Sequence, residues 1–170
     1  VAMRIGMEAG IATGWSGTRN LSKKIFEKSG LALDGIASLR LMMLDGDFDS
    51  IRNEIELIRA DSEYAESVNL RFETFLLESE LELSEASAKI AEYNDVLEAV
   101  GKASMSGDSE EVANTQSKET VLRAQILNLF KKGISLADKA ITINPSDPRP
   151  YLRKHSMLQS LNELQHSESV

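Results

Sequence analysis

The stretch Lys139-Ala-Ile-Thr-Ile-Asn-Pro-Ser-Asp-Pro-Arg-Pro-Tyr-Leu152 decides the fold of this chain. Its first residues continue an amphipathic helical pattern, and the residue before a proline disfavours the helical region of backbone conformation. We therefore predict that one helix ends at Asn144-Pro145 and that another begins a few residues later. A joint of this kind is typical of chains built from antiparallel helical pairs.

The composition predicts helix almost throughout. The chain has 170 residues, of which 42% are hydrophobic and only 5% aromatic, with three prolines. Strand-like alternation is scarce, and apolar residues recur at helical spacing instead. We predict an all-α fold of about six to eight helices in a single domain over residues 1–170. Antiparallel neighbours pack as a short α-solenoid or as a helical bundle.

Two long helices dominate the predicted order of elements. Apolar residues recur at helical spacing over residues 70–100 and again over residues 117–143. The polar stretch between them predicts a flexible loop over residues 104–116. The C-terminal tail, residues 165–170, is expected to fray.

Charge and cysteine content exclude several classes of protein. The net charge of −8 disfavours nucleic-acid binding, because a phosphate backbone would be repelled. The absence of cysteine excludes disulfides, thiolate metal sites and thiol catalysis. No apolar run approaches the roughly 20 residues that span a bilayer, and the N-terminal residues show no signal-peptide pattern. These features leave the compartment open, with a cytoplasmic location preferred to a periplasmic one.

One acidic stretch has the spacing of a calcium site. The carboxylates of Asp45, Asp47, Asp49 and Glu56 match ligand positions in an EF-hand loop. Ser50 replaces the glycine that this loop needs for its sharp turn. We therefore interpret the stretch as a turn between helices, with Asp49 or Ser50 capping the second helix, and predict no metal.

The sequence lacks the residue patterns of a nucleophile elbow and of a histidine metal site. Ser16 lies in a Gly-Trp-Ser-Gly sequence, but Thr18 stands where a nucleophile elbow has its second glycine, and no strand precedes it. His155 and His166 have no aspartate or cysteine partner at metal-binding spacing. We interpret both histidines as surface residues and predict no catalytic residue and no cofactor.

Glutamates between Glu73 and Glu85 are the remaining source of acid–base chemistry. Glu78 and Glu82 are four residues apart and share a helix face. Without a histidine partner or a visible pocket, a solvated helix face is the preferred interpretation of these side chains.

The joint at Pro145 resembles the boundary of a tetratricopeptide repeat, a helical pair of 34 residues. Counted back from this proline, Ala140 and Gly133 fall on the small residues of that family's second helix. Phe130 falls on the aromatic residue before the helix crossing, and Tyr151 on the one that opens the next unit. The resemblance covers about half of the chain.

This resemblance implies a non-catalytic interaction or adaptor domain with a groove that receives a peptide or a partner helix. A homodimer is compatible with it. We interpret Phe72 and Phe75 as core rather than as part of the binding surface. The candidate partner-binding residues are Arg71, Tyr151, Arg153 and Lys154.

A helical-bundle sensor is the alternative. Residues 39–47 and 58–62 are similar to segments of the extracytoplasmic ligand-sensing modules of bacterial receptors. Helices as long as those predicted over residues 70–100 and 117–143 suit a bundle better than short repeat helices do. Such a module would signal through displacement of a helix.

Overall fold

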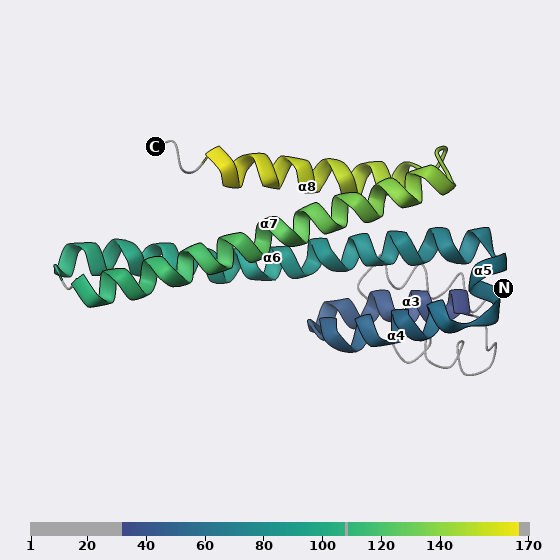
Figure 1. Cartoon of the computed structure of the whole chain (residues 1–170), viewed down its shortest axis with the longest axis horizontal. Helices are drawn as coiled ribbons and strands as arrows, with labels where there is room; N and C mark the ends of the chain where they lie inside the picture. Colours follow the sequence, from purple (N-terminus) through teal and green to yellow (C-terminus); the bar gives the residue numbers. More distant parts are fainter. Residues whose placement is uncertain (1–31, 108, 167–170) are drawn as a thin grey trace. The chain divides into compact units, whose positions relative to one another are not determined.

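The structure is a computed structural model that describes residues 32–107 and 109–166. Within those residues every element is helical, which confirms the all-α prediction (Figure 1). Six α-helices and one short 3-10 helix follow one another along the chain. They are α3 (Ala32–Met42), η1 (Met43–Asp45), α4 (Phe48–Ala60), α5 (Ser62–Glu66), α6 (Val68–Ser106), α7 (Ser109–Ile143) and α8 (Pro148–His166).

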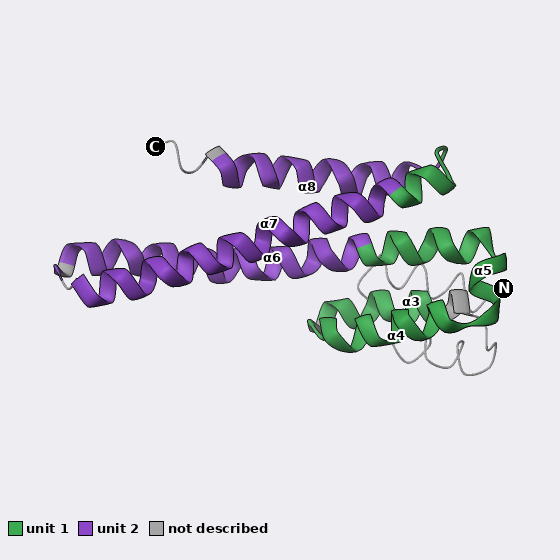
Figure 2. Cartoon of the chain, viewed as in Figure 1, with its two compact units in different colours: residues 1–78, 139–146 green, residues 79–138, 147–170 purple. Residues whose placement is uncertain are grey.

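The chain divides into two compact units (Figure 2). Unit 1 comprises residues 1–78 and 139–146, and unit 2 comprises residues 79–138 and 147–170. The long helices α6 and α7 each contribute residues to both units. That residues 1–170 act as one domain stays a prediction.

The hydrophobic core of unit 1 involves α4 and the first turns of α6. Ile51 and Ile55 are four residues apart on α4, and both are buried. Phe72 belongs to a second buried cluster with Ala140, and Phe75 packs at its edge. The interpretation of Phe72 and Phe75 as core residues is confirmed.

The turn before α4 is formed by a glycine and an aspartate. Gly46 has a φ of 74°, a left-handed conformation that favours glycine. Asp47 caps the helix, because its side-chain oxygen accepts a hydrogen bond from the Ser50 amide at 3.3 Å. The prediction that Asp49 or Ser50 is the cap is therefore wrong. Both residues lie inside a helix that begins at Phe48.

The position of α4 is also incompatible with an EF-hand calcium loop over residues 45–56. An EF-hand ion is wrapped by about 12 residues of irregular backbone, whereas residues 48–56 are helical. Among the residues that the structure describes, no group of three or more acidic or histidine side chains could hold a metal ion.

Unit 2 is built on an antiparallel hairpin of α6 and α7, with α8 packed along it (Figure 1). The three helices share one buried cluster, so the structure has the bundle form of the predicted fold. The cluster contains Ala86 and Tyr93 from α6, Leu122, Ile126, Leu129, Phe130 and Ala137 from α7, and Met157 and Leu164 from α8.

The turn of the hairpin is shorter than the sequence predicts. The loop expected over residues 104–116 is wrong in extent, because α6 continues to Ser106 and α7 already begins at Ser109. Glu110 and Glu111 lie in the first turn of α7, where negative charge interacts favourably with the helix dipole. The low hydrophobicity of this stretch therefore reflects solvent-exposed helix ends and not a loop.

The joint between α7 and α8 lies where the proline pattern places it. The first helix ends at Ile143 and the second begins at Pro148. Asp147 caps α8, since its carboxylate accepts a hydrogen bond from the Arg149 amide at 2.9 Å, and proline suits the first helical position. The helix then continues to His166, so residues 165 and 166 belong to its last turn, and residues 167–170 lie outside the described residues.

Gly133 marks a close approach between the helices of unit 2. It is buried, and a Cβ atom there would lie 2.5 Å from Met157 Sδ and 3.2 Å from Glu82 Cβ. Ser79 Oγ also donates a hydrogen bond of 3.0 Å to its carbonyl oxygen. Ala140, in unit 1, is fully buried as well. Both small residues are therefore core positions, as the sequence predicts.

Candidate partner-binding groove

The glutamates of α6 do not form the solvated face that the sequence predicts. Glu78 is 8% exposed and Glu82 is 1% exposed. Each carboxylate accepts a hydrogen bond of 2.6 Å from a cation, Arg59 for Glu78 and Lys132 for Glu82. The prediction is wrong because burial of these carboxylates is compensated by cations from other helices, which the periodicity of α6 alone does not reveal.

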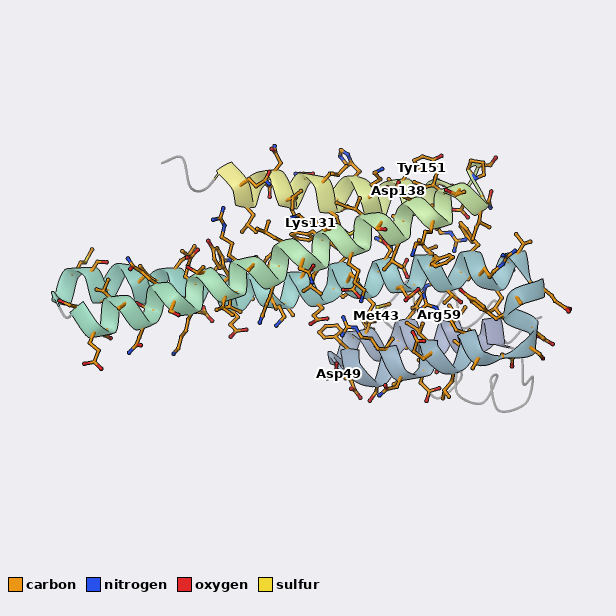
Figure 3. All side chains as sticks on the ribbon, in the orientation of Figure 1. Met43, Asp49, Arg59, Lys131, Asp138 and Tyr151 are labelled. Carbon is orange, nitrogen blue, oxygen red and sulfur yellow. The ribbon has the colours of Figure 1, made fainter. Side chains whose placement is uncertain are left out.

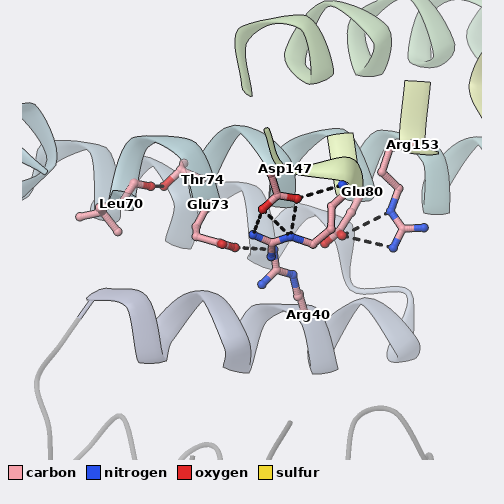
Figure 4. Close-up of polar contacts among 8 residues, drawn as sticks. Arg40, Leu70, Glu73, Thr74, Glu80, Asp147 and Arg153 are labelled. Carbon is pink, nitrogen blue, oxygen red and sulfur yellow. Dashed lines mark hydrogen bonds and ion pairs between the residues drawn. The ribbon is translucent and has the colours of Figure 1, made fainter. Parts of the chain in front are cut away.

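Two further ion pairs tie neighbouring helices to α6. In unit 1, Arg40 donates to Glu73 at 2.9 Å (Figure 4). In unit 2, Arg153 donates to Glu80 at 3.3 Å (Figure 4). Within each unit, acidic side chains of α6 therefore hold a neighbouring helix against it.

Arg59 shows how such a pair is stabilised. Burial by itself lowers the pKa of this guanidinium, but the carboxylate of Glu78, the hydrogen bond with Tyr64 and the carboxylate of Glu56 together outweigh that effect and raise its pKa overall. The guanidinium also lies 6.0 Å from the ring centroid of Phe75, within reach of a cation–π contact. Its place on α4 is labelled in Figure 3. The residue is a structural anchor of unit 1.

The residues predicted to bind a partner are spread over both units. Arg71 lies on α6 in unit 1, and Tyr151, Arg153 and Lys154 lie in the first turns of α8 in unit 2. Tyr151 is 45% exposed (Figure 3). Besides the bond of Arg153 to Glu80, Lys154 donates to Asp138 at 2.7 Å. Both charges are therefore engaged inside unit 2, and their role in binding stays a prediction.

The remaining candidates from the sequence are the two histidines and the stretch around Ser16. His155 is exposed, which confirms its interpretation as a surface residue. The stretch around Ser16 and Thr18 lies outside the described residues, and so does the side chain of His166.

A groove of about 510 Å³ runs between α6 and α7 in unit 2. Each helix contributes one stripe of side chains to it, and none of the described lining residues belongs to α8. Its main lining residues are Lys89, Glu92 and Val96 from α6, and Lys118, Val121 and Leu122 from α7.

The spacing along each helix explains why these side chains meet. Residues 89, 92 and 96 are three and four positions apart, and so are residues 118, 121 and 125, so each set occupies one helix flank. The buried seam of the hairpin runs beside them. There Tyr93 donates a hydrogen bond of 2.8 Å to Glu119, which connects the two helices.

The groove combines an apolar floor with an excess of positive charge. Leu122 is buried, whereas Val121 is 53% exposed and has no helix covering it among the described residues. The described lining has two lysines and one glutamate, a net charge of +1 in a chain of net charge −8. Neither Lys89 nor Lys118 forms an ion pair with another described residue.

Sequence reasoning missed this groove. The helical stripes of the sequence place Leu97 and Leu122 in the seam between the helices, but Leu97 is 41% exposed and Val96 packs against the buried cluster instead. On α7, Val121 stands one position before the buried Leu122, on the adjacent and exposed flank. Apolar residues on a second face of a helix, beside the face that already packs on a neighbour, indicate a further surface for binding a helix.

Comparisons of the chain with protein-family models, with curated proteins and with solved structures found no match. None of the helices over residues 32–107 and 109–166 is long and apolar enough to cross a membrane.

Proposed function

We propose that the protein is a non-catalytic interaction module that binds an amphipathic helix of a protein or peptide partner in the groove between α6 and α7. The observation that carries this proposal is the exposure of Val121 in a groove with Leu122 at its floor. Burying such a side chain contributes about 1.5–3 kcal/mol. A third helix would provide that burial.

The shape of the groove supports a helical occupant. Side chains of a third helix pack into the furrow between two antiparallel helices in the same way as in a helical bundle. The lining extends over residues 89–96 of α6 and 117–125 of α7, which corresponds to about 11–12 Å along each axis. A partner helix would therefore contact the groove over about two turns, with apolar residues at positions i, i+3 or i+4, and i+7.

The lining is less suited to catalysis or to a small molecule. Among the described residues that line the groove, Glu92 is the one carboxylate and no histidine is present, so an acid–base pair is lacking. Small-molecule sites bury about 70–90% of their ligand. A groove whose central valine is half exposed offers less enclosure than that.

The joint at Asn144–Asp147 supports the same class of function. It resembles a tetratricopeptide repeat boundary, and that family implies recognition of a peptide or partner helix. On this view Tyr151, which is exposed at the start of α8, belongs to a second binding surface of unit 2, because Arg153 and Lys154 beside it pair with Glu80 and Asp138, outside the groove lining.

A ligand-sensing bundle is the second candidate function. The observation that favours it is the uninterrupted length of α6 and α7, 39 and 35 residues, because a long continuous helix can transmit a displacement. A sensor would be stabilised by a small molecule in a thermal-shift screen. That stabilisation would persist in the Val121→Asp variant, whereas binding of a helical peptide would not.

Two matched valines test the helix-binding proposal. Binders are first selected from a displayed library of amphipathic peptides of about 18 residues, five helical turns, and their affinities are measured by fluorescence anisotropy. Val121→Asp should weaken binding by at least about tenfold, or 1.4 kcal/mol. Val68, which is 55% exposed on α6 outside the groove lining, provides the control. Val68→Asp should leave the affinity unchanged, and equal effects of the two substitutions would refute the proposal.

A further inference from the structure

We infer that the partner helix carries carboxylates along both edges of its apolar stripe, where they meet Lys89 and Lys118. This inference rests on the proposed function and adds to it the charge class of the partner. The two lysines come from opposite walls of the groove, one from α6 and one from α7.

The placement of the lysines supports two-sided recognition. Val96, Val121 and Leu122 supply the apolar contact surface of the lining. A helix whose apolar stripe contacts these residues would present the positions that flank its stripe to the lysine-bearing walls. Charges at such flanking positions set the choice of partner in coiled coils.

Both lysines are available for a partner. Four other cations of unit 2 are engaged by acidic side chains, in the pairs Lys132–Glu82, Arg153–Glu80, Lys154–Asp138 and Lys102–Glu98. Lys89 and Lys118 form no ion pair with any described residue. A carboxylate brought into the groove therefore meets them without breaking an existing pair.

Glu92 makes the charge preference of the groove differ along the length of the partner helix. It lies on α6 three residues after Lys89, about one helical turn along the same wall. An acidic residue opposite Glu92 would be repelled, so the partner should be acidic beside Lys89 and neutral or basic one turn away. Repulsion of this kind discriminates between partners as effectively as attraction does.

The same charges argue against a second copy of the chain as the occupant. A two-fold dimer would place the groove lining against itself. The lining has a net charge of +1, so two copies would bring like charges together. An acidic helix from another protein is electrostatically the better occupant.

A charge-randomised library tests the inference. Amphipathic peptides with a fixed leucine stripe and with Glu, Lys or Gln at each flanking position are displayed and selected on the full chain. The wild-type protein should enrich Glu at the flanking positions beside Lys89 and Lys118, and the double variant Lys89→Glu/Lys118→Glu should enrich Lys there instead. Lys131→Glu makes the same type of charge change on α7 outside the groove lining, and should still enrich Glu.

The size of the charge preference is measured with a matched pair of selected peptides. One peptide has Glu at the flanking positions and the other has Lys. The acidic peptide should bind the wild-type chain about five- to tenfold more tightly at low salt, as expected for two exposed ion pairs. This ratio should fall towards one at about 1 M salt because of screening.

The outcomes separate the inference from the proposal that it extends. If no peptide of any charge is selected, the proposed function fails. If binders are selected without a preference for Glu, or if the double variant keeps that preference, the inference fails and the proposed function stands. Dimerisation of the chain that Lys118→Glu abolishes would assign the groove to a second copy and overturn the inference.

Discussion

Lys132 Nζ lies 2.6 Å from Glu82 Oε1, and the glutamate is almost completely buried while the lysine is half exposed. The pair joins α6 to α7 across 50 residues of sequence. One residue along α7 from the lysine is Gly133, whose missing side chain leaves room for Met157. A buried carboxylate and a close helix contact therefore occupy the same level of the hairpin.

Removal of the lysine should destabilise the protein. Lys132→Met leaves the Glu82 carboxylate buried without this counter-charge, and we expect a loss of about 2 kcal/mol, moderated by the exposure of the lysine. The double variant Glu82→Met/Lys132→Met should recover part of that loss, since no buried charge remains. Urea denaturation followed by circular dichroism gives both values. Lys131→Met is the control and should change stability by less than about 0.5 kcal/mol; an equal effect of the two substitutions would contradict the role of the pair.

Two glycines should respond in opposite directions to alanine. At Gly133 an added Cβ would overlap Met157, so Gly133→Ala should cost about 1–2 kcal/mol despite the gain in helix propensity. Gly101, also helical, has no atom within 4 Å of the added Cβ. Gly101→Ala should stabilise the protein by up to about 1 kcal/mol. Thermal denaturation measures both, and stabilisation by Gly133→Ala would show that the helices are not tightly packed there.

The cap of α8 should lose its electrostatic contribution in acid. The side-chain hydrogen bond from Arg149 lowers the pKa of Asp147, so the folded state favours the carboxylate. The resulting stabilisation is present above the unfolded-state pKa of about 3.9 and is lost as the pH falls through the lower folded-state pKa. Asp147→Asn keeps an acceptor for the cap but removes the charge. The stability difference between wild type and this variant should be constant near neutral pH and should shrink below about pH 4; a difference that does not change down to pH 2 would contradict the assignment.

The phenol of Tyr93 should ionise at a higher pH than that of an exposed tyrosine. Burial and the hydrogen bond to Glu119 raise the pKa of this phenol, so the folded state favours its neutral form. Its contribution to stability is complete below the unfolded-state pKa of about 10 and is lost as the pH rises through the higher folded-state pKa. The ultraviolet titration of wild type minus that of Tyr93→Phe should therefore show a midpoint above about 10. A midpoint at or below 10 would exclude the hydrogen bond to Glu119.

Local signals predicted the fold well. The proline after Asn144 and the small residues Gly133 and Ala140 are short-range features, and the structure has the helix end and the buried positions that they predict. The loop predicted over residues 104–116 is wrong because low hydrophobicity is also typical of an exposed helix end, and Ser109 and the two glutamates that follow it favour the start of a helix.

Long-range features were not predictable in the same way. The pairing of Glu82 with Lys132 depends on the register of α6 against α7, which a single sequence does not specify. The groove depends on that register too, because Val96 and Val121 line one furrow only when the helices are aligned as they are. The candidate residues on α8 came from the family resemblance, and their role in binding stays a prediction.

Methyl NMR of the valines tests the central claim, binding of a helix in the groove, most directly. A selected amphipathic peptide is titrated into the full chain, and the methyl resonances of Val96, Val121 and Val68 are followed. We predict saturable shifts for Val96 and Val121, with the Val68 methyl groups unchanged. Shifts at Leu152 and Leu158, which are exposed on α8, together with unchanged groove valines, would place the partner elsewhere and contradict the account.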